Sequence, residues 1–120
     1  MTTFMMRTHK QSSKASEFFL KLNDELDIDK YKLDKYKELF MLGSFQVMHD
    51  SDLAYHNIYI RCAQYAVSKE SLFNCLDQEE KFPSPNSECF DAGIYRENVL
   101  RIIADIKQQL AAGTLDYLFQ

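Results

Sequence analysis

Residues 71–110 read SLFNCLDQEEKFPSPNSECFDAGIYRENVLRIIADIKQQL, and this stretch decides the fold. Its apolar residues recur at intervals of three and four, which is the spacing of an amphipathic helix and not the alternation of a strand. Pro83 and Pro85 end the first helical pattern, because proline lacks a backbone N–H and disfavours the helical conformation in the residue before it. The segment therefore predicts two amphipathic helices joined by a loop, with Gly113 as the stop of the second helix.

Residues 12–42 predict two further helices. The first is expected to begin at Ser12 or Ser13, with an apolar face formed at helical spacing by Ala15, Phe18, Phe19, Leu22 and Leu26. The second is expected to follow a cap at Asp29 or Asp34. It either ends at Gly43 or continues weakly beyond it.

The sequence His49-Asp50-Ser51-Asp52 has the composition of a loop and cap cluster. A third helix is therefore expected to begin after Asp50 or Ser51, because short polar side chains satisfy the free N–H groups of a helix start. Ser68 is expected to cap the helix that contains the first apolar pattern of residues 71–110.

The bulk composition favours a few long elements joined by short loops. The chain has 120 residues, of which 46% are hydrophobic, but only three are Gly and two are Pro. The predicted fold class is thus all-α, a single-domain bundle of four to five helices. Residues 12–120 form this domain, and residues 1–11 are expected to be a flexible N-terminus.

Several features favour a reduced, cytoplasmic location with no membrane contact. No apolar run reaches the roughly 18 residues that span a bilayer, and residues 1–16 lack the apolar core of a signal peptide. Cys62, Cys75 and Cys89 form an odd set without CxxC spacing. We expect two or three of them to be buried free thiols.

Negative charge is concentrated in the C-terminal two thirds of the chain. Residues 1–40 carry eight bases and seven acids (+1), whereas residues 41–120 carry six bases and eleven acids (−5), which together give the net charge of −4. Binding to nucleic acid requires a basic surface and is disfavoured. An acidic surface favours a basic protein as the partner.

The sequence contains no pattern that indicates a catalytic, metal or cofactor site. His9, His49 and His56 occur outside any HExxH or Cys/His cluster, so solvated or capping histidines are expected and no metal. Isolated glycines cannot form a phosphate-binding loop. We therefore predict that the protein is not an enzyme and has no cofactor; a helical nuclease that uses His56 and Arg61 is an alternative.

Aromatic residues are abundant, and most fit the core. Tyr31, Tyr55, Tyr59 and Tyr95 fit the buried faces poorly and are expected to be exposed anchors of an interface. Net charge favours a monomer, while exposed tyrosines and the aromatic C-terminus allow a weak dimer.

The C-terminal third of the chain resembles the colicin D-type immunity proteins, a family that includes immunity proteins of contact-dependent inhibition systems. The residues that carry this resemblance are Leu72-Phe73, Asp77, Phe82-Pro83, Pro85, Leu100-Arg101, Ile103 and Leu110. The resemblance implies a small helical bundle that binds the nuclease domain of a bacterial toxin, typically a tRNA-cleaving ribonuclease. In such a complex carboxylates take the places of RNA phosphates in the basic cleft of the toxin.

On this basis the expected function is that of an immunity protein. It would cover the cleft of its cognate toxin with an acidic helix–loop–helix surface. The residues expected to bind the toxin are Asp77, Glu79, Glu80, Glu88, Asp91, Tyr95 and Glu97. The alternative is a small regulatory or adaptor protein of phage or plasmid origin that binds another basic protein.

Overall fold

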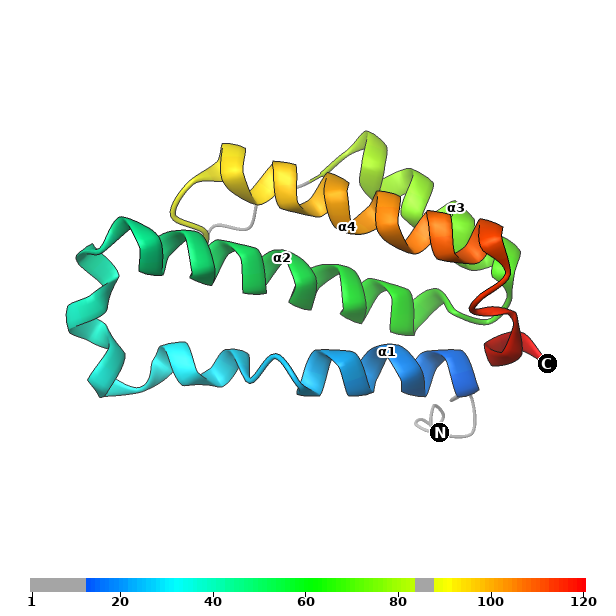
Figure 1. Cartoon of the computed structure of the whole chain (residues 1–120), viewed down its shortest axis with the longest axis horizontal. Helices are drawn as coiled ribbons and strands as arrows, with labels where there is room; N and C mark the ends of the chain where they lie inside the picture. Colours follow the sequence, from blue (N-terminus) through cyan, green and yellow to red (C-terminus); the bar gives the residue numbers. More distant parts are fainter. Residues whose placement is uncertain (1–12, 84–87) are drawn as a thin grey trace, which may run out of the picture.

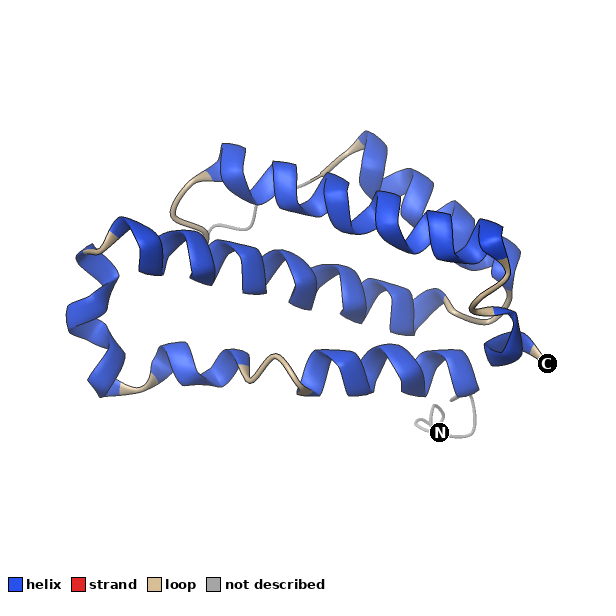
Figure 2. Ribbon diagram, viewed as in Figure 1, coloured by secondary structure: helices blue, strands red, loops and turns tan. Residues whose placement is uncertain are grey.

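The structure is a computed structural model that describes residues 13–83 and 88–120, and this part of the chain is all-α (Figures 1 and 2). Four α-helices and three 3-10 helices (η) follow one another without a strand in the described residues. In chain order they are α1 (Lys14–Asp24), η2 (Ile28–Lys32), η3 (Asp34–Met41), α2 (Gly43–Tyr65), α3 (Lys69–Lys81), α4 (Ala92–Ala112) and η4 (Asp116–Phe119). The helical fold class is therefore confirmed.

The long helix α2 lies in the middle of the molecule. Figure 1 shows α1 and η2 along one side of α2, η3 across the end where the chain turns into α2, and α4 along the other side of α2. Helix α3 contacts both α2 and α4, and η4 folds back against α1. One hydrophobic core joins all four α-helices, with Phe19, Ile58, Leu72 and Ile103 among its fully buried side chains.

The predicted helix ends at Ser13, Ser68 and Gly113 are confirmed. The hydroxyl oxygens of Ser13 and Ser68 each accept a hydrogen bond, at 3.0 Å, from the backbone N–H three residues further on. Ser13 also donates to the carbonyl of Ala66 at 3.0 Å, which ties the start of α1 to the end of α2. Gly113 has a φ of 82°, in the left-handed region that glycine reaches without a Cβ clash.

The structure differs from the sequence prediction in residues 28–52. The expected second helix is two short 3-10 helices, and Gly43 is the first residue of α2 instead of a break after a helix. The prediction of a loop and cap at residues 49–52 is wrong, because α2 runs through them without interruption. The Asp50 carboxylate contacts a distant segment of the chain and caps no helix start.

Two tyrosines expected on the surface are buried. Tyr31 is 6% exposed and Tyr95 is 3% exposed, so the prediction of four exposed tyrosine anchors is wrong for this pair. Tyr55 and Tyr59 are partly buried and pack against the core. A tyrosine can enter a core where its hydroxyl finds a partner, and the Tyr95 hydroxyl accepts a hydrogen bond from Asn57 Nδ2 at 2.6 Å.

The cysteines and histidines also depart from expectation. All three thiols are free, but only Cys62 is buried, while Cys75 and Cys89 are half-buried. His49 and His56 are partly buried and hydrogen-bonded, so the prediction of solvated or capping histidines is wrong for both. The predicted flexible segment, residues 1–11, lies outside the described residues, as do Pro85 and residue 9.

In the part of the chain that the structure describes, no helix is both long enough and apolar enough to cross a membrane.

Candidate functional site

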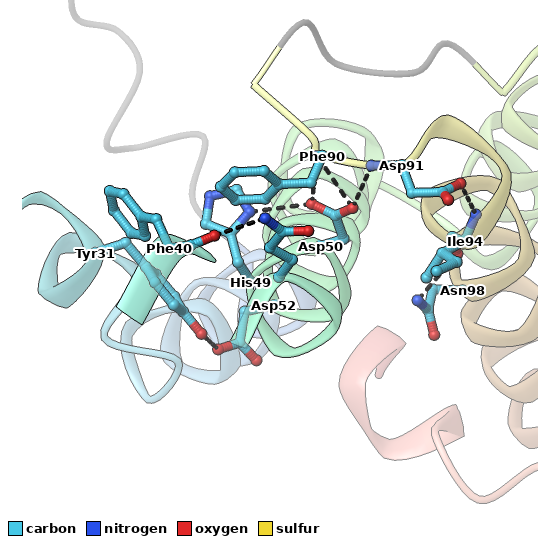
Figure 3. A network of polar contacts seen from close by, with 10 residues as sticks. Tyr31, Phe40, His49, Asp50, Asp52, Phe90, Asp91, Ile94 and Asn98 are labelled. Atoms are coloured by element: carbon cyan, nitrogen blue, oxygen red, sulfur yellow. Dashed lines mark hydrogen bonds and ion pairs between the residues drawn. The ribbon is translucent and has the colours of Figure 1, made fainter. Parts of the chain in front are cut away.

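A buried carboxylate holds the backbone of Phe90 and Asp91, directly before α4 (Figure 3). Asp50 is 1% exposed and lies near the middle of the N-terminal half of α2. Its carboxylate accepts hydrogen bonds from the backbone N–H of Phe90, at 2.9 and 3.1 Å, and from the backbone N–H of Asp91, at 2.8 Å. A buried carboxylate requires such donors, because an unpaired buried charge is strongly unfavourable.

His49 completes this arrangement from the neighbouring position on α2. Its Nδ1 lies 3.0 Å from Asp50 Oδ1. The imidazole ring stands edge-on between the rings of Tyr31 and Phe90, with centroids 4.9 and 5.0 Å away. The loop before α4 is thus held to α2 by both polar and aromatic contacts, and it is also joined to η2 through Tyr31.

The loop continues directly into the start of α4. The Asp91 Oδ1 accepts a hydrogen bond from the Ile94 backbone N–H at 3.1 Å, so Asp91 caps this helix. Its negative charge is stabilised there, because the amino end of a helix carries partial positive charge. Asp91 remains exposed, as do Glu88 before it and Glu97 one turn and a half into α4.

Three of the four acids of α3, Asp77, Glu79 and Glu80, are paired with cations of neighbouring helices. Lys107 of α4 binds both Asp77 and Glu80, with 3.2 Å between its Nζ and Glu80 Oε1. The Asp77 carboxylate is the main cause that raises the pKa of Lys107, and burial partly opposes it. Glu79 faces the other way, toward α2, where its Oε2 lies 3.6 Å from Arg61 Nε.

The predicted acidic site is therefore divided into two parts. Asp77 and Glu80 lie with Lys107 beside α4, and this group carries a net charge of −1. Glu88, Asp91 and Glu97 lie exposed on the loop and on the first turns of α4. Tyr95 must be removed from the predicted surface, because its side chain is buried against Asn57.

Asp50 and His49 are the residues of this site that sequence reasoning missed. The sequence placed them in a loop, where they had no role beyond capping. One signal was available. If a single helix runs from Phe45 to Leu53, its spacing places the side chain of Asp50 on the inward face. A buried acid at such a position needs donors from elsewhere in the chain.

Two further cavities open beside α2. One of about 430 Å³ is lined by residues of α2 and α3, and one of about 330 Å³ is lined mainly by α2, with Glu79 of α3 and Tyr95 of α4. His56 and Arg61, which the nuclease alternative paired, both line the second cavity. The His56 Nδ1 lies 2.6 Å from Asn23 Oδ1, so this ring nitrogen is already engaged by α1.

The thiols are poorly suited to nucleophilic chemistry. Burial raises the pKa of Cys62 and Cys75, and it also raises the pKa of Cys89, where the nearby Asp50 carboxylate adds to the effect. A raised pKa reduces the fraction of thiolate, which is the reactive form. Among residues 13–83 and 88–120, no group of three or more His, Cys, Asp or Glu side chains is arranged to hold a metal ion.

Comparisons of the chain with protein-family models, with curated protein sequences and with solved structures found no match.

Proposed function

We propose that this protein is an immunity protein that binds and neutralises the nuclease domain of a cognate bacterial toxin. The surface that would contact the toxin is formed by Glu80, Glu88, Asp91 and Glu97, and we call it the acidic surface. The expectation rests on the resemblance of residues 72–110 to the colicin D-type immunity proteins. Its basic partner would be the cleft in which the toxin holds RNA phosphates, and inhibition of this kind requires no catalysis by the inhibitor.

The observation that carries this proposal is the buried Asp50 carboxylate, which fixes the backbone that bears Asp91 and adjoins Glu88. An inhibitor gains affinity when its contact groups are already ordered, because binding then costs less conformational entropy. The hydrogen bonds from Phe90 and Asp91 hold this loop against the long helix α2 before any partner arrives. The part of the acidic surface that contains Asp91 is in this sense preorganised.

The charges of the acidic surface suit a basic partner. Glu88, Asp91 and Glu97 are exposed, and the group of Asp77, Glu80 and Lys107 adds one further net negative charge. Complementary charge speeds the encounter of two proteins, and a few desolvated carboxylate–Arg or carboxylate–Lys pairs slow their separation. A cell that makes a toxic nuclease needs both effects.

The test is a growth-rescue experiment with the toxin domain encoded beside the gene of this protein. Co-expression is expected to restore growth, and the two purified proteins are expected to form a one-to-one complex. Failure to bind and to protect would refute the immunity function. The same failure together with tight binding to a different basic protein would favour the regulatory or adaptor alternative.

Charge reversal tests the position of the interface. The triple variant Glu80→Lys, Glu88→Lys and Glu97→Lys is expected to lower the association rate by about tenfold or more at low salt, with a smaller effect at high salt. The matched control reverses the exposed acids Asp24, Glu25 and Glu38, and it should leave the rate nearly unchanged. Equal effects of both triple variants would place the interface elsewhere.

A further inference from the structure

A third cavity opens between η2 and the N-terminal half of α2. Its volume is about 320 Å³, which lies within the range of pockets that bind small ligands. Residues of η2 line it on one side and residues of α2 on the other, and Glu88 of the acidic surface lines it as well. We call it the η2–α2 cavity.

Two histidines bring hydrogen-bond acceptors to this cavity. The Nδ1 of His49 lies 3.0 Å from the Asp50 carboxylate, and the Nδ1 of His56 lies 2.6 Å from Asn23 Oδ1. Both of these oxygens can only accept a hydrogen bond, so each Nδ1 carries a proton. In a neutral imidazole the other nitrogen, Nε2, is then an acceptor. Both rings line the cavity, and in each of them the nitrogen that remains for a ligand is an acceptor.

Carboxylates add negative charge to the same cavity. Asp29 and Glu88 line it together with Lys32, and the formal charges of these three residues sum to −1. The closest atoms of Lys32 and Asp29 are 3.5 Å apart, and their side chains are 79% and 83% exposed, so this ion pair is weak. The Asp29 carboxylate therefore keeps acceptor positions for a ligand.

Aromatic rings form another part of the wall. The rings of Tyr31 and His49 meet edge to face with their centroids 4.9 Å apart, and Phe40 lines the same cavity (Figure 3). The Tyr31 hydroxyl donates a hydrogen bond to the Asp52 carboxylate, which fixes the ring before a ligand arrives. Aromatic rings attract cations, and a planar guanidinium packs against them better than a compact ammonium does.

We propose that the η2–α2 cavity binds the guanidinium group of an arginine side chain of a partner protein. This group has five N–H donors and no acceptor, which matches a cavity of imidazole acceptors and carboxylates. Its positive charge balances the charge of −1 on the lining residues. A metal ion is a poorer occupant, because the described residues contain no group of three or more His, Cys, Asp or Glu side chains arranged to hold one.

The cavity adjoins the acidic surface through Glu88, which belongs to both. A basic partner that covers Glu88 therefore brings its own side chains next to the cavity. Arginine in a pocket is a frequent energetic anchor of protein interfaces, and the charges around such an anchor contribute less. The identity of the partner rests on the proposed function, under which this arginine belongs to the basic cleft of the toxin.

The test titrates N-acetyl-arginine N-methylamide into the full chain and follows the NMR signals of His49, His56 and Leu53, which line the cavity. The matched control ligand is the corresponding citrulline compound, which has the same shape without the positive charge. The arginine compound is expected to bind with a Kd of about 1–10 mM, and the citrulline compound at least about tenfold more weakly.

Two double variants test the position of the site. Asp29→Asn with Glu88→Gln removes both lining carboxylates and should weaken binding of the arginine compound by about fivefold or more. The control, Asp24→Asn with Glu25→Gln, changes exposed acids that do not line the cavity and should bind like the wild type. Circular dichroism must show that both double variants keep their helix content.

The proposal is overturned if the arginine compound shifts neither histidine, if the citrulline compound binds as tightly, or if both double variants weaken binding equally. A toxin domain that binds and protects while the arginine compound fails to bind would overturn the cavity alone and leave the immunity function standing. Binding of the arginine compound to the cavity without any binding or protection by a toxin would support the guanidinium site and refute the immunity function.

Discussion

Replacing Asp50 by alanine should destabilise the protein more than replacing any exposed acid. The substitution leaves the backbone N–H groups of Phe90 and Asp91 without their acceptor at the boundary between α2 and α4. A donor that loses its partner costs about 1–3 kcal/mol where water cannot replace it, and both of these bonds are partly buried. Relief from burying the Asp50 charge offsets part of this loss, so the expected decrease in the free energy of unfolding is about 2–5 kcal/mol.

The measurement is urea unfolding followed by far-ultraviolet circular dichroism, with Asp24→Ala as the matched control. Asp24 is exposed near the end of α1, and its replacement should change the free energy of unfolding by less than about 0.5 kcal/mol. Asp50→Asn keeps one carbonyl oxygen as an acceptor but turns an amide NH₂ toward the second donor. This variant should lose about 1–3 kcal/mol.

Amide hydrogen exchange supplies a local readout of the same contact. In the wild type the amide protons of Phe90 and Asp91 should exchange slowly, because both donate to Asp50. In Asp50→Ala they should exchange much faster than the amide protons at the centre of α4. If Asp50→Ala were as stable as Asp24→Ala and kept slow exchange at both positions, the proposed fixing of the acidic loop would be refuted.

Three other measurements probe the fold. Gly113→Ala should lower the free energy of unfolding by about 1–2 kcal/mol, because φ is +82° there and a Cβ would lie 3.2 Å from an Asp116 oxygen; an unchanged midpoint of thermal unfolding would contradict the left-handed cap. Tyr95→Phe should lower the free energy of unfolding by about 1 kcal/mol, since the Asn57 amide loses its acceptor. A stability equal to that of the wild type would show that water replaces the Tyr95 hydroxyl as the acceptor. Iodoacetamide should label native Cys62 far more slowly than Cys89 at pH 8. Because the pKa of each thiol is raised, the thiolate fraction grows as the pH rises, and labelling should become faster. Equal labelling rates of the two cysteines in the native protein would contradict the burial of Cys62.

Much of the secondary structure follows from short-range patterns in the sequence. The caps at Ser13 and Ser68 and the stop at Gly113 are local devices, and each depends on residues within one or two turns. The apolar spacing of residues 99–110 likewise predicts a helix with one buried side, and Val99, Ile103, Ile106 and Leu110 are buried as expected. Interactions between residues this close along the chain can be predicted from a single sequence.

Residues 49–52 show where local reasoning fails. Short polar side chains favour helix starts, so the sequence indicated a cap, and yet α2 continues through all four residues. The donors that stabilise Asp50 are the N–H groups of residues 40 and 41 positions further along the chain. No pattern of spacing within the helix contains that information.

The acidic residues show the same division between sequence and structure. Their number and their concentration between residues 70 and 91 are properties of the sequence alone. Which of them meet a cation is not, because Lys107 reaches Asp77 and Glu80 only when α3 and α4 lie side by side. The division of the predicted site into a paired group and an exposed group therefore arose only from helix packing.

The sequence by itself determined that the chain is helical, where α1 and α3 begin and α4 ends, and that its C-terminal part is acidic. These properties depend on residues close together along the chain, so periodicity and capping chemistry reveal them. The tertiary structure alone decided that Asp50 and Tyr95 turn inward and that α2 and α3 form a cavity lined by Arg61 and Glu79. A polar side chain enters a core only where a distant segment supplies its hydrogen-bond partner, and folding brings such segments together.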